Sequence, residues 1–346
     1  MNSETVIRDS VISVSSLRKR FNLEAGFFAP LGRYVHAVNG VSFSIGKNET
    51  YGLVGESGCG KTTTARLLVR MYEADEGEII FRGEDGNINI RGLKGQNLKR
   101  YRERVKYVFQ DPARSLNPRM TIYEVLTSGA RWSGGKRGPA ALKDEAVAIL
   151  EEVGLSAADL ERRPAEFSGG QRQRISIARG LIMKPNLLIC DEVVSALDVS
   201  IQGQILNLLL DLRDRRKSLG EEISFLFIAH DLKVASYFCD RIGVMYRGEI
   251  MEEAPAATLW KNYLHPYTEL LFSSINKNKE VTLSMSQQEN SKNAPISGKT
   301  TSSTTESNGC SFASRCPYAQ AACLNEKPSL REAGAGHLTR CHIAKS

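Results

Sequence analysis

A glycine-rich stretch with the sequence GESGCGKTT contains the residue types that hold phosphate groups. Its members are Gly55, Glu56, Ser57, Gly58, Cys59, Gly60, Lys61, Thr62 and Thr63. The glycines let backbone N–H groups converge on phosphate oxygens, and a helix starting after the loop would add the partial positive charge of its N-terminus. At this spacing Lys61 would reach the β and γ phosphates, and the Thr62 hydroxyl would bind Mg²⁺. The loop therefore predicts a site for a nucleoside triphosphate.

An Asp-Glu pair follows an apolar run in NLLICDE, residues 186–192. Four consecutive apolar residues predict a strand that is buried on both faces, and the C-terminal end of such a strand is where open parallel sheets bind ligands. There Asp191 would hold the metal through its water shell, and Glu192 would polarise an attacking water. An isolated Asp-Glu pair is usually a surface turn, but beside a phosphate loop the catalytic interpretation is favoured.

A second loop of the phosphate-binding type comes much later in the chain. It consists of Ser168, Gly169, Gly170 and Gln171, in the stretch EFSGGQRQRISIARGL. Apolar residues after it recur at helical spacing, so a helix is expected to begin just after Gly170 and to point its positive end at a ligand. One nucleotide hardly needs two such loops from one chain. Two subunits packed head to tail would instead hold two ATP molecules, each between the glycine-rich loop of one chain and this signature loop (residues 168–171) of the other.

Composition and patterning give the elements that must position these loops. The chain has 346 residues, 41% hydrophobic and 25% charged, and a formal charge of +7 spread along its length. We expect a globular protein without a secretory signal, and its apolar runs fall short of the roughly 18 residues that span a bilayer. Short apolar runs (YGLVG, VKYVF, NLLIC, FLFIAH) alternate with helical patterns. This alternation predicts an α/β fold with parallel strands and crossover helices.

The chain is expected to have two folded parts joined by a linker. Residues 276–309 are polar and rich in Ser and Thr, so they cannot bury enough apolar surface to fold. They would connect a large domain, residues 1–275, to a short tail, residues 310–346.

Together these motifs resemble the nucleotide-binding subunits of ABC transporters, over about residues 11–275. The resemblance implies a P-loop NTPase (RecA-like) core, a helical subdomain at about residues 112–180, and ATP with Mg²⁺ as ligands. It also implies roles for single residues in VFQDP, SALD, IAHDL and LRKRF. These are Gln110 as the Q-loop residue that touches Mg²⁺, Asp198 as the D-loop residue, His230 as the switch histidine at the γ phosphate, and Phe21 as the aromatic residue stacked on adenine, with Tyr34 competing for that place. Phe167 and Val193 depart from the family pattern without altering a phosphate-contacting group.

Three further segments resemble the oligopeptide, dipeptide and nickel importers: DPARSLNPRMTI, LHPYTELL and GCSFASRCPYAQAAC. This resemblance implies an ATPase that lies peripherally on the cytoplasmic face of the membrane and powers peptide import, with nickel and oligosaccharides as alternative solutes. Its partners would be a second ABC ATPase subunit (a copy or a paralogue), two membrane permeases and, indirectly, an extracytoplasmic solute-binding protein. The alternative is a soluble ABC ATPase acting on nucleic acid or ribosomes, but such proteins usually carry two cassettes or coiled-coil insertions. A small-molecule kinase would leave the signature loop unexplained.

The tail carries Cys310, Cys316, Cys323 and Cys341, separated by five, six and seventeen residues. A segment with so little apolar material is expected to need a covalent or metal staple. Disulfides are disfavoured in a reducing cytosol, and zinc sites favour closer cysteine pairs. Iron–sulfur clusters tolerate wider spacing, and the family resemblance implies a [4Fe-4S] cluster, which we place ahead of zinc. A zinc site completed by His337 or His342 and a docking segment with unligated thiols remain as alternatives.

Overall fold

The computed structural model describes residues 10–22, 34–83, 86–132, 138–276 and 308–344. In these ranges the main sheet has eight strands, in the order β11-β12-β10-β9-β3-β8-β7-β6. The strands β3, β6, β7, β8 and β9 run parallel to one another, and β10, β11 and β12 extend the sheet with antiparallel pairs. Their bounds are β3 Thr50–Val54, β6 Val105–Val108, β7 Leu187–Asp191, β8 Ser224–Ala229, β9 Arg241–Tyr246, β10 Glu249–Pro255, β11 Arg331–Gly334 and β12 His337–Thr339. The predicted α/β class with a P-loop type of core is confirmed.

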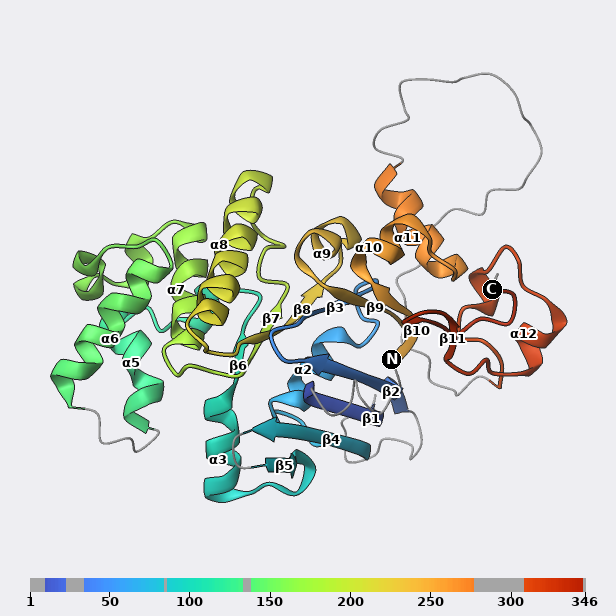
Figure 1. The fold of residues 1–346 in the computed structure, drawn as a ribbon, viewed down its shortest axis with the longest axis horizontal. Helices are drawn as coiled ribbons and strands as arrows, with labels where there is room; N and C mark the ends of the chain where they lie inside the picture. The colour runs from blue at the N-terminus through green and yellow to red at the C-terminus, as the bar shows by residue number, and fades with distance from the viewer. Residues whose placement is uncertain (1–9, 23–33, 84–85, 133–137, 277–307, 345–346) are drawn as a thin grey trace, which may run out of the picture.

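A smaller antiparallel sheet covers one face of the main sheet, as Figure 1 shows. Its order is β2-β1-β4-β5, with β1 Ser10–Asn22, β2 Tyr34–Gly46, β4 Glu76–Gly83 and β5 Gly86–Asn89. Every residue of β7 and β8 is buried, and successive side chains enter different cores. Phe225 and Phe227 of β8 pack among the helices, whereas Leu226 and Ile228 pack toward the small sheet. The continuous apolar runs seen in the sequence reflect this burial on both faces.

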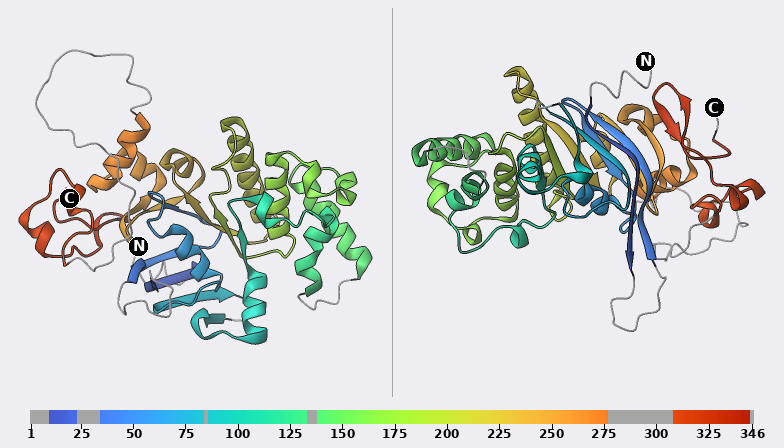
Figure 2. Two further views of the ribbon diagram at one scale, coloured as in Figure 1. Left: turned by 180° about the vertical axis from the view of Figure 1, so that it is seen from behind. Right: turned by 90° about the horizontal axis from the view of Figure 1, so that it is seen from below.

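Helices cover the other face of the main sheet and form a lobe at one of its ends (Figures 1 and 2). The lobe contains α4 Pro112–Ser115, α5 Ile122–Trp132, α6 Pro139–Glu152 and α7 Gly169–Leu181, with the 3-10 turns η2 Ala157–Glu161 and η3 Pro164–Glu166. The remaining elements before the tail are α2 Lys61–Leu68, η1 Ile90–Gly92, α3 Gly95–Arg104, α8 Val199–Ser218, α9 Leu232–Phe238, α10 Ala256–Lys261 and α11 Pro266–Asn276. None of the helices in the described ranges is long and apolar enough to cross a membrane.

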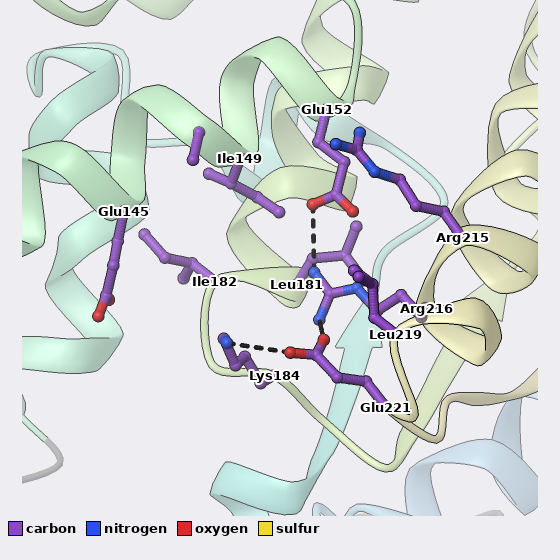
Figure 3. Close-up of a pocket in the computed structure, with 11 residues that line it drawn as sticks. Glu145, Ile149, Glu152, Leu181, Ile182, Lys184, Arg215, Arg216, Leu219 and Glu221 are labelled. Atoms are coloured by element: carbon purple, nitrogen blue, oxygen red, sulfur yellow. Dashed lines mark hydrogen bonds and ion pairs between the residues drawn. The ribbon is translucent and has the colours of Figure 1, made fainter.

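A buried arginine at the end of α8 ties the helical lobe to the main sheet. The guanidinium of Arg216 lies 3.1 Å from the carboxylate of Glu152 in α6 and 2.9 Å from that of Glu221. Figure 3 shows the two carboxylates reaching Arg216 from different sides, with Lys184 bound to Glu221 as well. Arg216 is only 7% exposed, so one cation joins a carboxylate of the lobe to one from the segment that leads into β8.

Arg216→Met is therefore expected to lower the free energy of unfolding by about 2 kcal/mol, because two carboxylates lose their buried partner. The cost falls below the roughly 3 to 5 kcal/mol of fully buried pairs because the Glu221 side chain stays 38% exposed. Denaturant unfolding measures the change, and Arg215→Met, at the exposed neighbouring position, is the matched control. Equal stability of the two variants would contradict the anchoring role.

The tail folds against the main sheet at the end opposite the helical lobe (Figure 2). It contains η4 Ala313–Arg315, α12 Ala321–Asn325, β11 and β12, and β12 pairs with β10 through Glu252 opposite Thr339. Phe312 is 1% exposed within the large core, and His337 Nε2 lies 2.7 Å from the buried Glu252 carboxylate. The core of the protein therefore holds the tail through strand pairing and buried contacts.

Candidate functional site

The glycine-rich loop joins the end of β3 to the start of α2, as its sequence predicts. Gly60 is the N-cap residue of α2 and has a φ of 112°, in the left-handed region that favours glycine. A Cβ atom there would lie 2.1 Å from the carbonyl oxygen of Ala37. Only glycine fits this contact, and the backbone of the loop is thereby wrapped tightly around the N-terminus of α2, the arrangement that suits a bound anion.

Lys61 lies inside the loop and is 4% exposed. Its ammonium donates to the carbonyl oxygens of Gly55 at 2.7 Å and Glu56 at 3.0 Å. Cys59 beside it is also buried, and burial raises the pKa of this thiol although the Lys61 charge opposes the shift. A neutral thiol is a poor nucleophile, so Cys59 acts as a small packing residue.

Asp191 at the end of β7 is joined directly to the glycine-rich loop. Its carboxylate is 3% exposed and accepts a hydrogen bond from the Thr62 hydroxyl at 3.0 Å. The Tyr107 hydroxyl donates to the other carboxylate oxygen. Burial and the neighbouring Asp191 carboxylate raise the pKa of Tyr107, so the phenol stays a neutral donor. Thr62 and Asp191 thus offer paired oxygen ligands of the kind that Mg²⁺ takes.

Tyr107 was not predicted from the sequence. Its strand, β6, pairs in parallel with β7, so that Tyr107 lies opposite Ile189 and the two strands end side by side. The polar hydroxyl in the mostly apolar stretch VKYVF was the available signal, but only the register of β6 against β7 shows which carboxylate it meets.

Tyr107→Phe is expected to reduce the free energy of unfolding by about 1 kcal/mol, because Asp191 loses a donor while staying buried. Tyr237→Phe is a suitable control, since the Tyr237 hydroxyl bonds Asn207 at the surface and its loss should change stability by less than about 0.5 kcal/mol. The measurement is urea unfolding in the absence of nucleotide. If both variants unfold at the wild-type denaturant concentration, Tyr107 does not support Asp191.

Glu192 follows Asp191 in an unusual backbone conformation. Its φ of 49° lies in the left-handed region, where non-glycine residues are strained and which is often found at functional sites. The turn is held by hydrogen bonds from Glu192 N to Ile228 O at 3.1 Å and from Ser195 N to Glu192 O at 3.1 Å. The carboxylate accepts from the Gln110 amide at 2.8 Å. The structure therefore brings together the two residues predicted as the water-orienting group and the Q-loop glutamine.

His230 and Asp198 lie near the same edge of the sheet. His230 follows the last residue of β8, is exposed, and lines a small pocket together with Glu192. Asp198 is the exposed N-cap residue of α8. Because β3, β7 and β8 are neighbouring parallel strands, their carboxyl ends gather the glycine-rich loop, the Asp-Glu pair and His230 at one edge.

The signature loop lies elsewhere, at the start of α7. Ser168 Oγ accepts from Gln171 N at 3.3 Å, and the Gln171 side chain accepts from Ser168 N at 3.0 Å, which forms a capping box. A Cβ at Gly170 would lie 2.8 Å from a methyl carbon of Ile201 in α8, so a larger residue here would displace the Ile201 side chain. Ser168 and Gly169 are exposed. Figure 1 shows α7 within the helical lobe, whereas α2 lies against the main sheet, so the two phosphate-type loops belong to different parts of the chain.

The two candidates for adenine stacking lie at one end of the hairpin formed by β1 and β2. Phe21 packs edge-on against Tyr72, with ring centroids 5.3 Å apart. Tyr34 pairs with Asn22 across the hairpin and lies under the guanidinium of Arg20. The choice between Phe21 and Tyr34 stays a prediction.

The structure does not support the predicted iron–sulfur or zinc site of the tail. In the described ranges, no three or more His, Cys, Asp and Glu side chains are grouped so that they could hold a metal ion. Cys323 and Cys341 are buried, while Cys310 and Cys316 pack against the large core. Burial raises the pKa of the Cys310, Cys316 and Cys341 thiols, and neighbouring thiols of the tail add to the shift. In the described ranges these cysteines pack as small side chains.

Comparison with known sequences gives matches along almost the whole chain. The family model described as "ABC transporter" matches residues 38–195, and the model "Oligopeptide/dipeptide transporter, C-terminal region" matches residues 251–323. The oligopeptide transport ATP-binding protein AppF of Bacillus subtilis is 39% identical over 97% of this chain and 98% of its own length. A probable peptide ABC transporter ATP-binding protein, y4tS of Sinorhizobium fredii, is 40% identical over 97% of this chain and 90% of its own. OppF of Bacillus subtilis is 47% identical over 73% of this chain and 80% of its own.

Solved structures with the same fold are also ATP-binding cassettes. A dimeric post-hydrolysis state of the cassette MJ0796, bound to ADP and Pi, has a TM-score of 0.60 and 25% identity, and the match covers 71% of this chain and 98% of that one. CbiO1 from Clostridium perfringens has a TM-score of 0.61 and 23% identity over 78% of this chain and 96% of that one. The latter supports the fold alone.

Proposed function

The chain belongs to the ATP-binding subunits of the oligopeptide and dipeptide ABC transporters, and we propose that it hydrolyses ATP to drive the import of peptides across a membrane. The observation that carries the ATPase assignment is the cluster at the carboxyl edge of the main sheet. There Thr62 of the glycine-rich loop binds Asp191, and Gln110 binds Glu192. A phosphate loop, a pair of metal ligands and a water-orienting carboxylate are the parts that phosphoryl transfer to water requires.

Each residue of the site has a proposed part in the reaction. The glycine-rich loop would cradle the phosphates with its N–H groups, and Lys61 would exchange its carbonyl partners for phosphate oxygens. Thr62, Asp191 and Gln110 would hold Mg²⁺, which neutralises charge on the β and γ phosphates when bound. Glu192 would orient the attacking water, His230 would contact the γ phosphate, and Phe21 would stack on adenine.

The signature loop would act on the nucleotide of a second subunit. Its exposed Ser168 and Gly169, at the N-terminus of α7, suit a phosphate presented by another molecule. The dimeric form of the related cassette MJ0796 supports this arrangement. In it ATP would join two subunits, with Asp198 at the boundary between the two sites, and hydrolysis would release them.

Peptide is the solute class that the relatives' names and the tail family support best. The solute would pass through two permease subunits after delivery by an extracytoplasmic binding protein. This chain would act at the cytoplasmic face of the membrane and would not contact the solute. The alternative of an ATPase acting on nucleic acid or ribosomes is not favoured, because the tail matches a transporter family.

The test is capture of a tagged full-length chain from detergent-solubilised membranes of the cells that encode it, followed by mass spectrometry, with untagged cells as the control. Two multi-spanning permeases and an ATPase partner are the expected companions. Recovery of ribosomal proteins or nucleic acid without permeases would contradict the importer assignment.

A further inference from the structure

The tail contacts the glycine-rich loop through a bidentate ion pair between Arg315 and Glu56. Nη1 and Nη2 of Arg315 each donate to one carboxylate oxygen of Glu56, both at 2.8 Å, across 259 positions of sequence. We propose that Arg315 is a positioning residue for ATP binding, which holds Glu56 so that the docked tail sets the affinity of the loop for the nucleotide phosphates. This inference rests on the proposed function at the same site.

Aromatic side chains fix the Arg315 side chain before any nucleotide arrives. Its guanidinium lies 5.6 Å from the ring centroid of Tyr246 and 5.8 Å from that of Phe312. Phe312 is buried and meets Tyr246 edge-on, with centroids 5.4 Å apart. Because a planar guanidinium stacked on aromatic faces has little rotational freedom to lose, its paired hydrogen bonds to a carboxylate are strong and specific in direction.

The backbone of Glu56 is held from the same side. Glu56 N donates to the hydroxyl of Tyr267 at 3.0 Å, and the ring of Tyr267 packs against Phe312 with centroids 5.4 Å apart. The carbonyl oxygen of Glu56 in turn accepts from the Lys61 ammonium at 3.0 Å. A continuous set of contacts thus leads from Arg315 through Glu56 to the lysine proposed to bind the phosphates.

The charges of Arg315 and Glu56 predict that their contact favours ATP binding. The Glu56 carboxylate sits in a loop that must receive a polyanion, and an unpaired carboxylate so close to the phosphates would oppose binding. Arg315 neutralises this charge and directs it toward the tail. Its removal should therefore weaken ATP binding through both a looser loop and a less compensated negative charge.

The tail has other attachments, so loss of Arg315 should leave it docked. β12 pairs with β10, His337 binds Glu252, and Arg340 Nε donates to Ile250 O at 3.0 Å. These contacts provide the control variant, Arg340→Met. The Arg340 guanidinium binds the carbonyl oxygens of Ile250 and Pro328, so its removal takes away a tail contact that does not involve Glu56, while strand pairing and His337 keep the tail docked.

The experiment measures binding of a fluorescent ATP analogue to the full chain, together with ATP hydrolysis and thermal unfolding without nucleotide. Arg315→Met is expected to raise the Kd about tenfold, at the low end for bonds between charged groups because both side chains keep contact with water. KM should rise with it, while kcat changes less than twofold, since the variant alters binding more than chemistry. Arg315→Lys keeps the charge without the paired geometry and should recover part of the affinity. Arg340→Met should bind the analogue as the wild type does.

Repeating the Arg315→Met substitution in a Glu56→Gln variant tests whether Arg315 acts through Glu56. In Glu56→Gln the loop lacks the charge that Arg315 compensates, so adding Arg315→Met should change the Kd less than twofold. A wild-type Kd for Arg315→Met, or the same tenfold loss in both backgrounds, would overturn the proposal. A wild-type chain that does not bind the analogue would instead refute the ATPase function on which it rests.

Discussion

Glu192→Gln is expected to bind ATP as tightly as the unchanged chain and to hydrolyse it about 10²- to 10⁴-fold more slowly, the usual effect of removing a general base. The substitution keeps the size of the side chain and both hydrogen-bonding atoms at its end. It also keeps the left-handed turn at residue 192 and leaves an acceptor for the Gln110 amide. The change is therefore confined to the negative charge that would draw a proton from water.

Two measurements separate binding from chemistry in this variant. Equilibrium binding of ATP should match the wild type, while phosphate release should fall, and ATP-bound dimers should accumulate. Glu222→Gln is the matched control, because Glu222 is exposed and pairs with Lys47 at the surface, and its turnover should be normal. Wild-type turnover by Glu192→Gln would remove Glu192 from the catalytic role.

The second large effect is expected when the two halves of the site are broken in different chains. Ser168→Arg should abolish hydrolysis by the dimer while leaving ATP binding to the monomer, because the bulky cation blocks the N-terminus of α7. Lys61→Ala should weaken binding itself, because the buried ammonium is the proposed partner of the β and γ phosphates. Neither variant alone should be active.

Mixing the two variants should restore activity. In a head-to-tail dimer of one chain of each kind, both lesions fall on one shared site, and the other site keeps an intact Lys61 and an intact Ser168. A mixture of wild type with Ser168→Arg also contains dimers with one intact site, so activity above that expected from its share of wild-type homodimers shows how much a single site supports. If that control is active and the mixture of Ser168→Arg with Lys61→Ala is inactive at every ratio, the two loops do not meet across a dimer. If the natural partner is a paralogue, the substitutions are divided between the two chains.

The parts of the site that could be predicted from the sequence are those determined by local structure. The glycine-rich loop carries its own conformational requirement at Gly60, and the Asp-Glu pair follows a strand whose apolar run marks its burial. Parallel pairing of β3, β7 and β8 then places the loop, Asp191 and His230 at one edge, as expected of neighbouring parallel strands. The capping box of Ser168 and Gln171 likewise lies within four consecutive residues.

Contacts between segments that are distant in the chain could not be predicted from the sequence. Tyr107 meets Asp191 only through the register of β6 against β7, and Arg315 meets Glu56 only because the tail docks beside the loop. The expectation that the tail needs a staple rested on its having little core of its own. The structure adds that Phe312 enters the core of the large domain and that β12 pairs with β10, contacts that the sequence of the tail does not reveal.

Uptake of a labelled peptide mixture by the cells that encode this chain, with the wild-type or the Glu192→Gln allele, tests the central claim most directly. ATP hydrolysis at Glu192 is proposed to drive peptide import, so the variant cells should contain the normal amount of the chain and accumulate little peptide above the level of a strain without it. Equal accumulation by the wild-type and Glu192→Gln cells, at equal amounts of the two proteins, would contradict the account.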